Sequence, residues 1–296
     1  MQIWPNLFIA GAPRCGTSSL HAWLDGMPGI RMSRIKEPNY FSRQVISAES
    51  PLVKPIRDEA KYLQLWSDAG TAHYRGEASP NYLEDPGAPA LIKERCPDAR
   101  IIVSLRDPVE RYHSTYLMLR NNRQSMGSVM DEIRKAIDGE GNPSQPIVPL
   151  RTGLYAAQLE RYRAVFGDRR LKVLVFEEMM ADVPGALREV LSFLDIDHST
   201  DGFAERPQRQ YSEARGPLVR FLFGNRLISR TAESLVPYGL RKWVRNAILV
   251  REAAKPALDG DAREFLRAYY RDDVAKLERL LGRRLPWPNF GGGALP

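Results

Sequence analysis

The sequence has little cysteine and no long apolar run. Its 296 residues include two cysteines, Cys15 and Cys96, which form neither a disulfide framework nor a cysteine-based metal cluster. No apolar stretch approaches the roughly 20 residues of a membrane-spanning helix, and the first residues lack the charged and then apolar pattern of a signal peptide. These absences suit a reducing compartment, and we expect a cytoplasmic protein.

The sequence also lacks the signatures of common nucleic-acid-binding modules. It contains neither zinc-finger spacing nor the aromatic RNA-binding motif, so its net charge of +7 needs another explanation. A basic protein can attract nucleic acid, an anionic membrane surface or an anionic small molecule. We expect no nucleic-acid partner and favour an anionic small molecule.

Predicted strands and helices alternate along most of the chain. Apolar or extended patterns predict strands at 7–10, 30–32, 73–78, 100–105 and 171–176. Helical periodicity predicts helices at 17–25, 58–66, 87–96, 108–121, 128–137, 154–166, 183–194 and 261–281. This alternation predicts a single α/β domain, with a central parallel sheet flanked by helices and a helical C-terminal portion. Ligands of such sheets bind at the carboxyl ends of the strands.

The first strand leads into a loop that is similar to a nucleotide P-loop but lacks its lysine. The spacing Gly11-x4-Gly16-Thr17-Ser18 places Thr17 where the pattern G-x-x-x-x-G-K-[ST] has lysine. The loop N–H groups and the helix dipole still favour an anion. The sequence therefore predicts a P-loop-like phosphate cradle with Arg14 as its cation, rather than an ordinary strand-to-helix turn.

The aspartate that holds Mg²⁺ in P-loop NTPases is also missing. That residue follows an apolar strand, whereas Arg106 follows the strand at 100–105 in this sequence. Its neighbour Asp107 is typical of a helix N-cap, and Glu110 stands at the capping-box spacing. We therefore expect no metal site. A P-loop-type kinase or NTPase that uses ATP and Mg²⁺ is the alternative function.

Arg106 and Ser114 indicate a second place for a phosphate. Ser114 lies two helical turns beyond Arg106, and charge-assisted hydrogen bonds contribute about 1.5–3 kcal/mol each. A nucleotide with phosphate-like groups in two places would use both this pair and the loop. For Arg106 alone, a surface salt bridge is an equally good explanation.

The segment Lys36-Glu37-Pro38 predicts a loop or a strand end, because the residue before proline favours an extended conformation. Neighbouring side chains of an extended segment face opposite sides. We therefore expect Lys36 and Glu37 to point apart. From their sequence alone, the two residues are best explained as a solvated pair on a loop.

Whole motifs of the chain resemble those of sulfotransferases. FIAGAPRCGTSSL is similar to their 5′-phosphosulfate loop, and RIIVSLRDPVERYHSTY to their 3′-phosphate motif. KEPNYF resembles the segment with the catalytic glutamate of heparan-sulfate sulfotransferases, GEASPNYL another of their segments, and DDVAKLERLLGRRLPW the closing helix of bacterial members. The resemblance implies the donor 3′-phosphoadenosine 5′-phosphosulfate (PAPS), the bisphosphate PAP as product and no metal.

The resemblance also implies roles for individual residues. The 5′-phosphosulfate would be held by Arg14, Cys15, Gly16, Thr17, Ser18 and Ser19, and the 3′-phosphate by Arg106 and Ser114. The loop that closes over the same 3′-phosphate would include Tyr211, Arg215 and Gly216. Glu37 becomes the general base that takes the proton of the acceptor hydroxyl, and Arg14 becomes the group that stabilises the leaving nucleotide.

Two residues depart from the pattern that the resemblance implies. The family usually has lysine where Arg14 stands, and arginine can stabilise charge but cannot give up a proton at accessible pH. Ala78 stands where several heparan-type members carry a lysine near the acceptor, which weakens the case for a heparan-like substrate. We expect the acceptor to be a carbohydrate hydroxyl or another small-molecule hydroxyl.

Three histidines are alternative bases. His21 lies on the first predicted helix and is more typical of a packing residue. His113 is next to Ser114 but on a different helical face, so we expect it to point away from the site. His73 precedes a strand, and the pattern does not place it.

The resemblance implies one sulfotransferase domain over residues 1–296. Within it we expect an α/β core with the nucleotide site at 1–195, a basic helical and lid-like segment at 196–260, and a closing helix with a tail at 261–296. The stretch 220–251 interleaves basic and apolar residues. It suits a lid over the acceptor or a membrane-surface face, and we prefer a helical subdomain with solvated cations.

Overall fold

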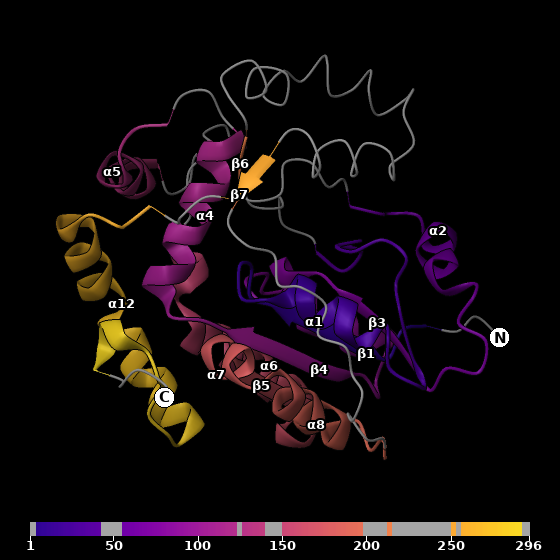
Figure 1. The fold of residues 1–296 in the computed structure, drawn as a ribbon. Helices are drawn as coiled ribbons and strands as arrows, with labels where there is room; N and C mark the ends of the chain where they lie inside the picture. Colours follow the sequence, from indigo (N-terminus) through magenta and orange to yellow (C-terminus); the bar gives the residue numbers. More distant parts are fainter. Residues whose placement is uncertain are drawn as a thin grey trace.

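A computed structural model of the chain describes residues 4–42, 55–122, 126–139, 150–197, 212–214, 250–252 and 256–291. Within these residues, a five-stranded parallel sheet has the order β2-β3-β1-β4-β5. Its strands are β1 (Leu7–Gly11), β2 (Ile30–Met32), β3 (Tyr74–Ala78), β4 (Arg100–Leu105) and β5 (Leu171–Val175). The predicted α/β class with a central parallel sheet is confirmed (Figure 1).

Helices connect the strands and cover the sheet (Figure 1). They are α1 (Thr17–Leu24), α2 (Glu59–Leu63), α3 (Ala88–Arg95), α4 (Pro108–Asn122), α5 (Val129–Gly139), α6 (Tyr155–Phe166), α7 (Phe176–Ala181), α8 (Val183–Phe193) and α12 (Gly260–Leu281). The expected helix at 58–66 divides into α2 and a 3-10 turn at Gln64–Trp66. Phe176, expected at the end of a strand, begins α7 instead.

Alternate residues of β1 enter two different cores. Leu7 and Ile9 pack with α1 and α8, whereas Phe8 and Ala10 pack in a larger core with α3, α4, α6 and α12. A parallel strand with both faces covered is apolar along its whole length. This is why the run at 7–10 is continuous rather than alternating.

The sheet order places β1 between β3 and β4. Leu7 pairs with Gly76 of β3 on one side and with Arg100 of β4 on the other. Because all three strands are parallel, their carboxyl ends lie at the same edge of the sheet. The loops that begin at Ala12, Ser79 and Arg106 are therefore neighbours, although up to 94 positions separate them in the sequence.

The C-terminal segment packs against the start of α4. Asp107 caps this helix as expected, since its Oδ1 accepts from the N–H groups of Val109 at 2.9 Å and Glu110 at 3.3 Å. The N–H of Asp107 donates to Glu177 at 3.1 Å, so Glu177 supplies the return bond of the expected capping box. Burial raises the pKa of both Asp107 and Glu177.

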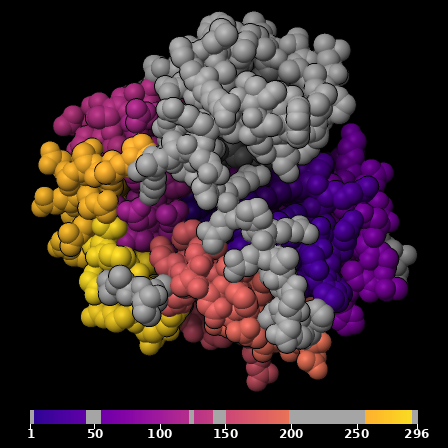
Figure 2. All heavy atoms as spheres, viewed as in Figure 1, coloured from indigo at the N-terminus to yellow at the C-terminus, as the bar shows by residue number. Residues whose placement is uncertain are grey.

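Two C-terminal side chains satisfy these buried acids. Asn289 donates to Asp107 Oδ2 at 2.8 Å, and Trp287 Nε1 donates to Glu177 Oε2 at 3.0 Å. Residues 256–291 cover one side of the molecule, opposite the N-terminal third (Figure 2). The segment after α12 therefore supports the start of α4.

Most of the basic stretch at 220–251 lies outside the described residues. Close to it, β6 (Ser212–Ala214) pairs antiparallel with β7 (Val250–Glu252). Among the helices that are described, none is long and apolar enough to cross a membrane.

Replacing Asn289 with alanine tests how strongly the C-terminal segment supports α4. Asn289→Ala leaves an oxygen of the buried Asp107 without its donor, so the free energy of unfolding should fall by about 1–3 kcal/mol. Urea denaturation monitored by circular dichroism measures this difference. The matched control is Arg284→Ala, because the Arg284 side chain is 88% exposed. Equal effects of the two substitutions would contradict the proposed support.

Candidate functional site

The loop between β1 and α1 is held at both ends by one residue of β4. Ser104 O accepts from the N–H of Ala12 at 2.7 Å, and Ser104 Oγ donates to Cys15 O at 2.7 Å. The loop therefore has a fixed shape at the carboxyl edge of the sheet. Fixed backbone groups are what an anion site at a helix N-terminus needs.

Gly16 ends this loop as the N-cap of α1 in a left-handed conformation, with φ of 79°. A Cβ at this position would lie 2.7 Å from Met179 and 3.0 Å from Phe176. Both the conformation and the close approach of α7 therefore require glycine. Gly16 therefore allows α7 to pack closely against the N-terminus of α1.

The residues after Arg14 differ in exposure. Ser18 is exposed, Ser19 is half-buried and Thr17 is buried. The Cys15 thiol is fully buried beside Tyr155, and burial raises its pKa to about 12. Cys15 can therefore shape the loop, but its thiol does not face solvent.

The structure brings Arg14, Arg106 and Ser114 together. Arg14 Nε donates to Ser114 Oγ at 3.1 Å, and Arg106 Nη1 lies 3.5 Å from Arg14 O. These contacts join residues from the loop after β1, the position just after β4 and the second turn of α4. The two separate phosphate-binding places expected from the sequence thus lie side by side.

Neighbouring residues hold the side chain and backbone of Arg106 in place. Its guanidinium lies over the Phe176 ring, 4.6 Å from the centroid, and Tyr155 Oη donates to its backbone carbonyl at 3.0 Å. Arg106 Nε is buried and finds no hydrogen-bond partner among the described residues. A fixed cation with an unsatisfied donor fits an anion better than it fits the surface salt bridge considered from the sequence.

Glu37 lies on the loop after β2, next to the end of β3. Its N–H donates to Ala78 O at 2.9 Å, and its own carbonyl accepts from Asn39 Nδ2 at 2.9 Å. Ala78 pairs with Ile9 of β1. The register therefore puts the Glu37 loop at the same edge of the sheet as the loop that contains Arg14.

The expectation that Lys36 and Glu37 point apart is wrong. Glu37 has a left-handed backbone with φ of 63°, and its carboxylate forms an ion pair with the Lys36 ammonium. The hydrogen bonds to Ala78 and Asn39 impose this conformation. The extended geometry on which the expectation depended is therefore lost at Glu37.

The three histidines have different surroundings. His21 is largely buried, and burial together with the charge of Lys36 lowers its pKa to about 4. His113 is buried, with its ring stacked on that of Tyr116. His73 immediately precedes β3 and therefore lies at the amino edge of the sheet, away from Glu37.

A buried carboxyl group that sequence reasoning missed lies beneath the Glu37 loop. Glu77 of β3 is 0% exposed, and burial raises its pKa to about 7. Tyr62 and Ser79 donate to its carboxylate, Ser79 at 2.6 Å, and Tyr82 donates at 3.1 Å. The available sequence signal was an acid within a strand that neighbours the predicted site.

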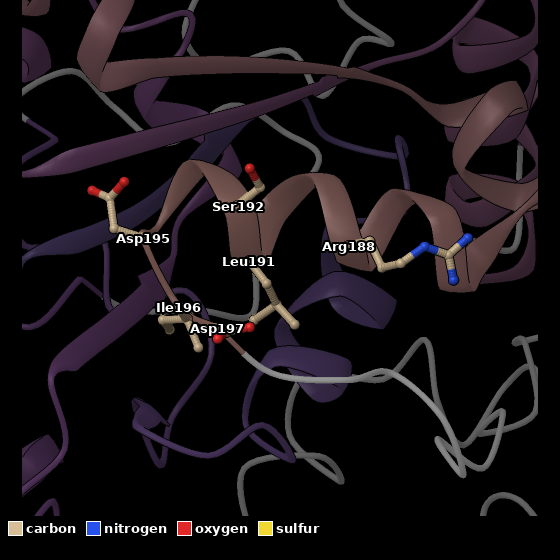
Figure 3. Close-up of a pocket in the computed structure, with 6 residues that line it drawn as sticks. All are labelled: Arg188, Leu191, Ser192, Asp195, Ile196 and Asp197. Carbon is tan, nitrogen blue, oxygen red and sulfur yellow. The ribbon is translucent and has the colours of Figure 1, made fainter.

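A surface hollow of about 360 Å³ lies elsewhere, at the end of α8 (Figure 3). It is lined by Arg188, Leu191, Ser192, Asp195, Ile196 and Asp197. Arg100, the first residue of β4, pairs with Asp195, which places the hollow at the amino edge of the sheet. This is the opposite edge from the phosphate loop, so the hollow is not part of the candidate site. The expected site residues Tyr211, Arg215 and Gly216 lie outside the described residues.

Known proteins resemble this chain in sequence. A model of the sulfotransferase family matches residues 59–201. Carbohydrate sulfotransferase 15 of Mus musculus is 26% identical over 254 residues, covering 66% of this chain and 44% of that protein. The bifunctional heparan sulfate N-deacetylase/N-sulfotransferase 4 of Mus musculus is 25% identical over 292 residues, covering 94% of this chain and 30% of that protein. The chain therefore spans less than half the length of these curated relatives.

A solved structure is similar along almost the whole chain. The sulfotransferase from Alicyclobacillus acidocaldarius is 30% identical, with a TM-score of 0.72, and the match covers 96% of this chain and 98% of that one. The two proteins are thus similar in both sequence and fold, over nearly the whole length of both chains. The chain belongs to the sulfotransferase family.

Proposed function

We propose that this protein transfers a sulfuryl group from PAPS to a hydroxyl group of a carbohydrate acceptor. The observation that carries the proposal is the 3.1 Å hydrogen bond between Arg14 and Ser114, with Arg106 beside Arg14. It joins the loop suited to a 5′-phosphosulfate to the residues suited to a 3′-phosphate. PAPS carries both groups on one nucleotide.

The donor fits the residues at the edge of the sheet. Gly16 is the left-handed N-cap of α1, at the end of the loop after β1, and the buried Arg106 Nε lacks a partner among the described residues. Arg14 and residues 15–19 would hold the phosphosulfate, and Arg106 and Ser114 the 3′-phosphate. Bound PAPS supplies the sulfuryl group, and PAP is the product.

Glu37 is the proposed general base. Transfer forms a bond from the acceptor oxygen to sulfur as the bond from sulfur to the phosphate oxygen breaks. The acceptor hydroxyl loses its proton in this step, and Glu37 would accept it. Arg14 would stabilise the charge that develops on the phosphate, since its guanidinium remains protonated.

The support for a carbohydrate acceptor comes from the relatives. The names of both curated relatives described above include carbohydrate or heparan sulfate. In addition, KEPNYF resembles the segment with the catalytic glutamate of heparan-sulfate sulfotransferases. Ala78 stands where several heparan-type members carry a lysine, which weakens the case for a heparan-like acceptor in particular. The kinase alternative is not favoured, because Thr17 stands in place of the lysine and Asp107 is engaged as a helix cap.

Ligand-induced thermal shifts test the donor. PAP should raise the melting temperature without added metal, since a ligand at 100 times its Kd stabilises by about 2.7 kcal/mol, and ATP with Mg²⁺ should have a much smaller effect. Arg106→Ala should weaken PAP binding by about 10- to 100-fold, and Arg284→Ala should leave it unchanged. Stabilisation by ATP with Mg²⁺ but not by PAP would overturn the proposed donor in favour of a kinase or NTPase.

The variant Glu37→Gln tests the base. It should bind PAP with near-normal affinity but lose turnover by about 10²- to 10⁴-fold, because the amide cannot accept the proton. PAP release is measured with PAPS and a panel of unsulfated oligosaccharides and simple alcohols. Glu59→Gln on α2 is the control and should keep full turnover. Normal turnover in Glu37→Gln would remove Glu37 from the mechanism.

A further inference from the structure

The loop that carries Glu37 needs support from outside itself. Glu37 and Asn39 both have left-handed backbones, with φ of 63° and 49°. A non-glycine residue in this region costs about 1–3 kcal/mol, so such a conformation persists only where surrounding groups impose it. The groups that hold this loop therefore decide where the Glu37 carboxylate lies.

Two hydroxyl groups hold the loop through its backbone. Ser79 Oγ accepts from the N–H of Asn39 at 3.0 Å, and Tyr82 Oη accepts from the N–H of Phe41 at 3.2 Å. The same two hydroxyl groups donate to Glu77, at 2.6 Å and 3.1 Å respectively. Each hydroxyl thus links the buried carboxylate to one backbone N–H of the Glu37 loop.

Which group donates and which accepts in these hydrogen bonds depends on the side chain at position 77. Above a pH of about 7, the pKa of the buried Glu77, its ionised carboxylate accepts hydrogen bonds and donates none. Each hydroxyl must therefore turn its hydrogen toward Glu77, which leaves a lone pair for the loop N–H. A side chain with its own N–H at position 77 would compete for that lone pair.

We propose that Glu77 is a positioning residue, whose carboxylate orients the Ser79 and Tyr82 hydroxyl groups so that they fix the loop at 37–41 and aim Glu37 at the acceptor. The inference rests on the proposed role of Glu37 as base. Glu77 itself is fully buried beneath the loop and contacts no acceptor.

Hydrogen exchange tests the links without any assay of activity. Glu77→Gln has nearly the same shape but adds an amide donor. The amide hydrogens of Asn39 and Phe41 should exchange about five- to tenfold faster than in the wild type. The Tyr155 amide, which donates to Asp273, is the internal reference and should not change. Unchanged exchange at both loop amides would overturn the proposal.

The matched control for this substitution is Glu132→Gln. Glu132 is also a buried glutamate, 2% exposed, and its carboxylate accepts from the Gly127 N–H and from Lys135 on α5. This variant should leave the exchange of Asn39 and Phe41 unchanged. The same acceleration in both variants would mean general loosening, and the proposal would fall.

A double-mutant cycle connects Glu77 to Glu37. Glu77→Gln alone should lower kcat by about 10- to 100-fold, because small misplacements of a catalytic group have effects of this size, with the Kd for PAP unchanged. In a Glu37→Gln background it should cause no further loss, since the two residues act through one route. Independent, multiplying losses would overturn the positioning role.

The cycle separates failure of this inference from failure of the proposed base. Full turnover in Glu37→Gln removes the base, whatever Glu77→Gln does. Lost turnover in Glu37→Gln with full turnover in Glu77→Gln overturns the inference alone. If Glu77→Gln does not fold, Ser79→Ala and Tyr82→Phe cut one link each. Ser79→Ala should accelerate exchange at Asn39 only and Tyr82→Phe at Phe41 only, and any other pattern contradicts the proposal.

The raised pKa of Glu77 also predicts a pH dependence of stability, which tests the burial of its carboxylate rather than its links to the loop. The titratable groups that face Glu77 are Tyr62, Tyr82, Cys96 and Tyr162, from α2, the turn after β3, the end of α3 and α6. Burial raises the pKa of Glu77 from 4.5 to about 7, so the folded state keeps its proton to a higher pH than the unfolded state.

Its contribution to stability is therefore fully present below pH 4.5 and is lost as the pH rises through 7. The melting temperature of the wild type relative to Glu77→Gln should be lower at pH 8 than at pH 5. A difference that does not change with pH would show that Glu77 does not titrate in this range. Glu132→Gln serves as the control for other effects of pH.

Discussion

The pairing of β1 between β3 and β4 is the constraint on which the candidate site depends. The backbone hydrogen bonds of these parallel strands align their carboxyl ends. Each end continues into a loop that carries polar residues of the candidate site or its surroundings. Ser104 of β4 then joins the β1 loop to its neighbour through both its carbonyl and its hydroxyl. Without this pairing, Arg14, Glu37 and Arg106 would have no fixed relation to one another.

Buried acids organise the elements around that edge. Glu177 joins α7 to the start of α4 and to Trp287, while Asp107 joins α4 to Asn289. Glu77 joins β3 to α2 and to the turn after β3. Removing a carboxylate from water is unfavourable unless donors surround it. Each of these acids therefore holds its donors, and the segments that carry them, in one arrangement.

The sequence allowed the phosphate cradle to be predicted but not the details of its neighbours. The glycines and hydroxyl groups of the loop are local features of one strand–loop–helix unit, so their spacing was informative. Glu110 had the correct spacing for a capping box, yet Glu177, 70 residues from Asp107, makes the return bond. Local spacing cannot report a competing side chain that comes from a distant helix, here α7.

The Lys36–Glu37 pair shows the same limit more sharply. The proline after Glu37 favoured an extended backbone, but the hydrogen bonds of Glu37 with Ala78 and Asn39 impose a left-handed one. Propensities for single residues amount to about 1 kcal/mol or less, and a few tertiary hydrogen bonds outweigh them. The role of Glu77 was equally hidden, because its partner Tyr62 comes from α2 and only the fold brings Ser79 and Tyr82 to the loop at 37–41.

The sequence by itself determined the α/β class and most strand and helix positions, and it allowed a phosphate-binding loop to be predicted, because apolar periodicity and glycine spacing act within short stretches of chain. Only the tertiary structure decided that Arg14 meets Ser114, that Glu37 lies beside Ala78 and that Glu77 lies beneath the loop. These relations depend on strand order and register, which arise when both faces of the sheet are buried together.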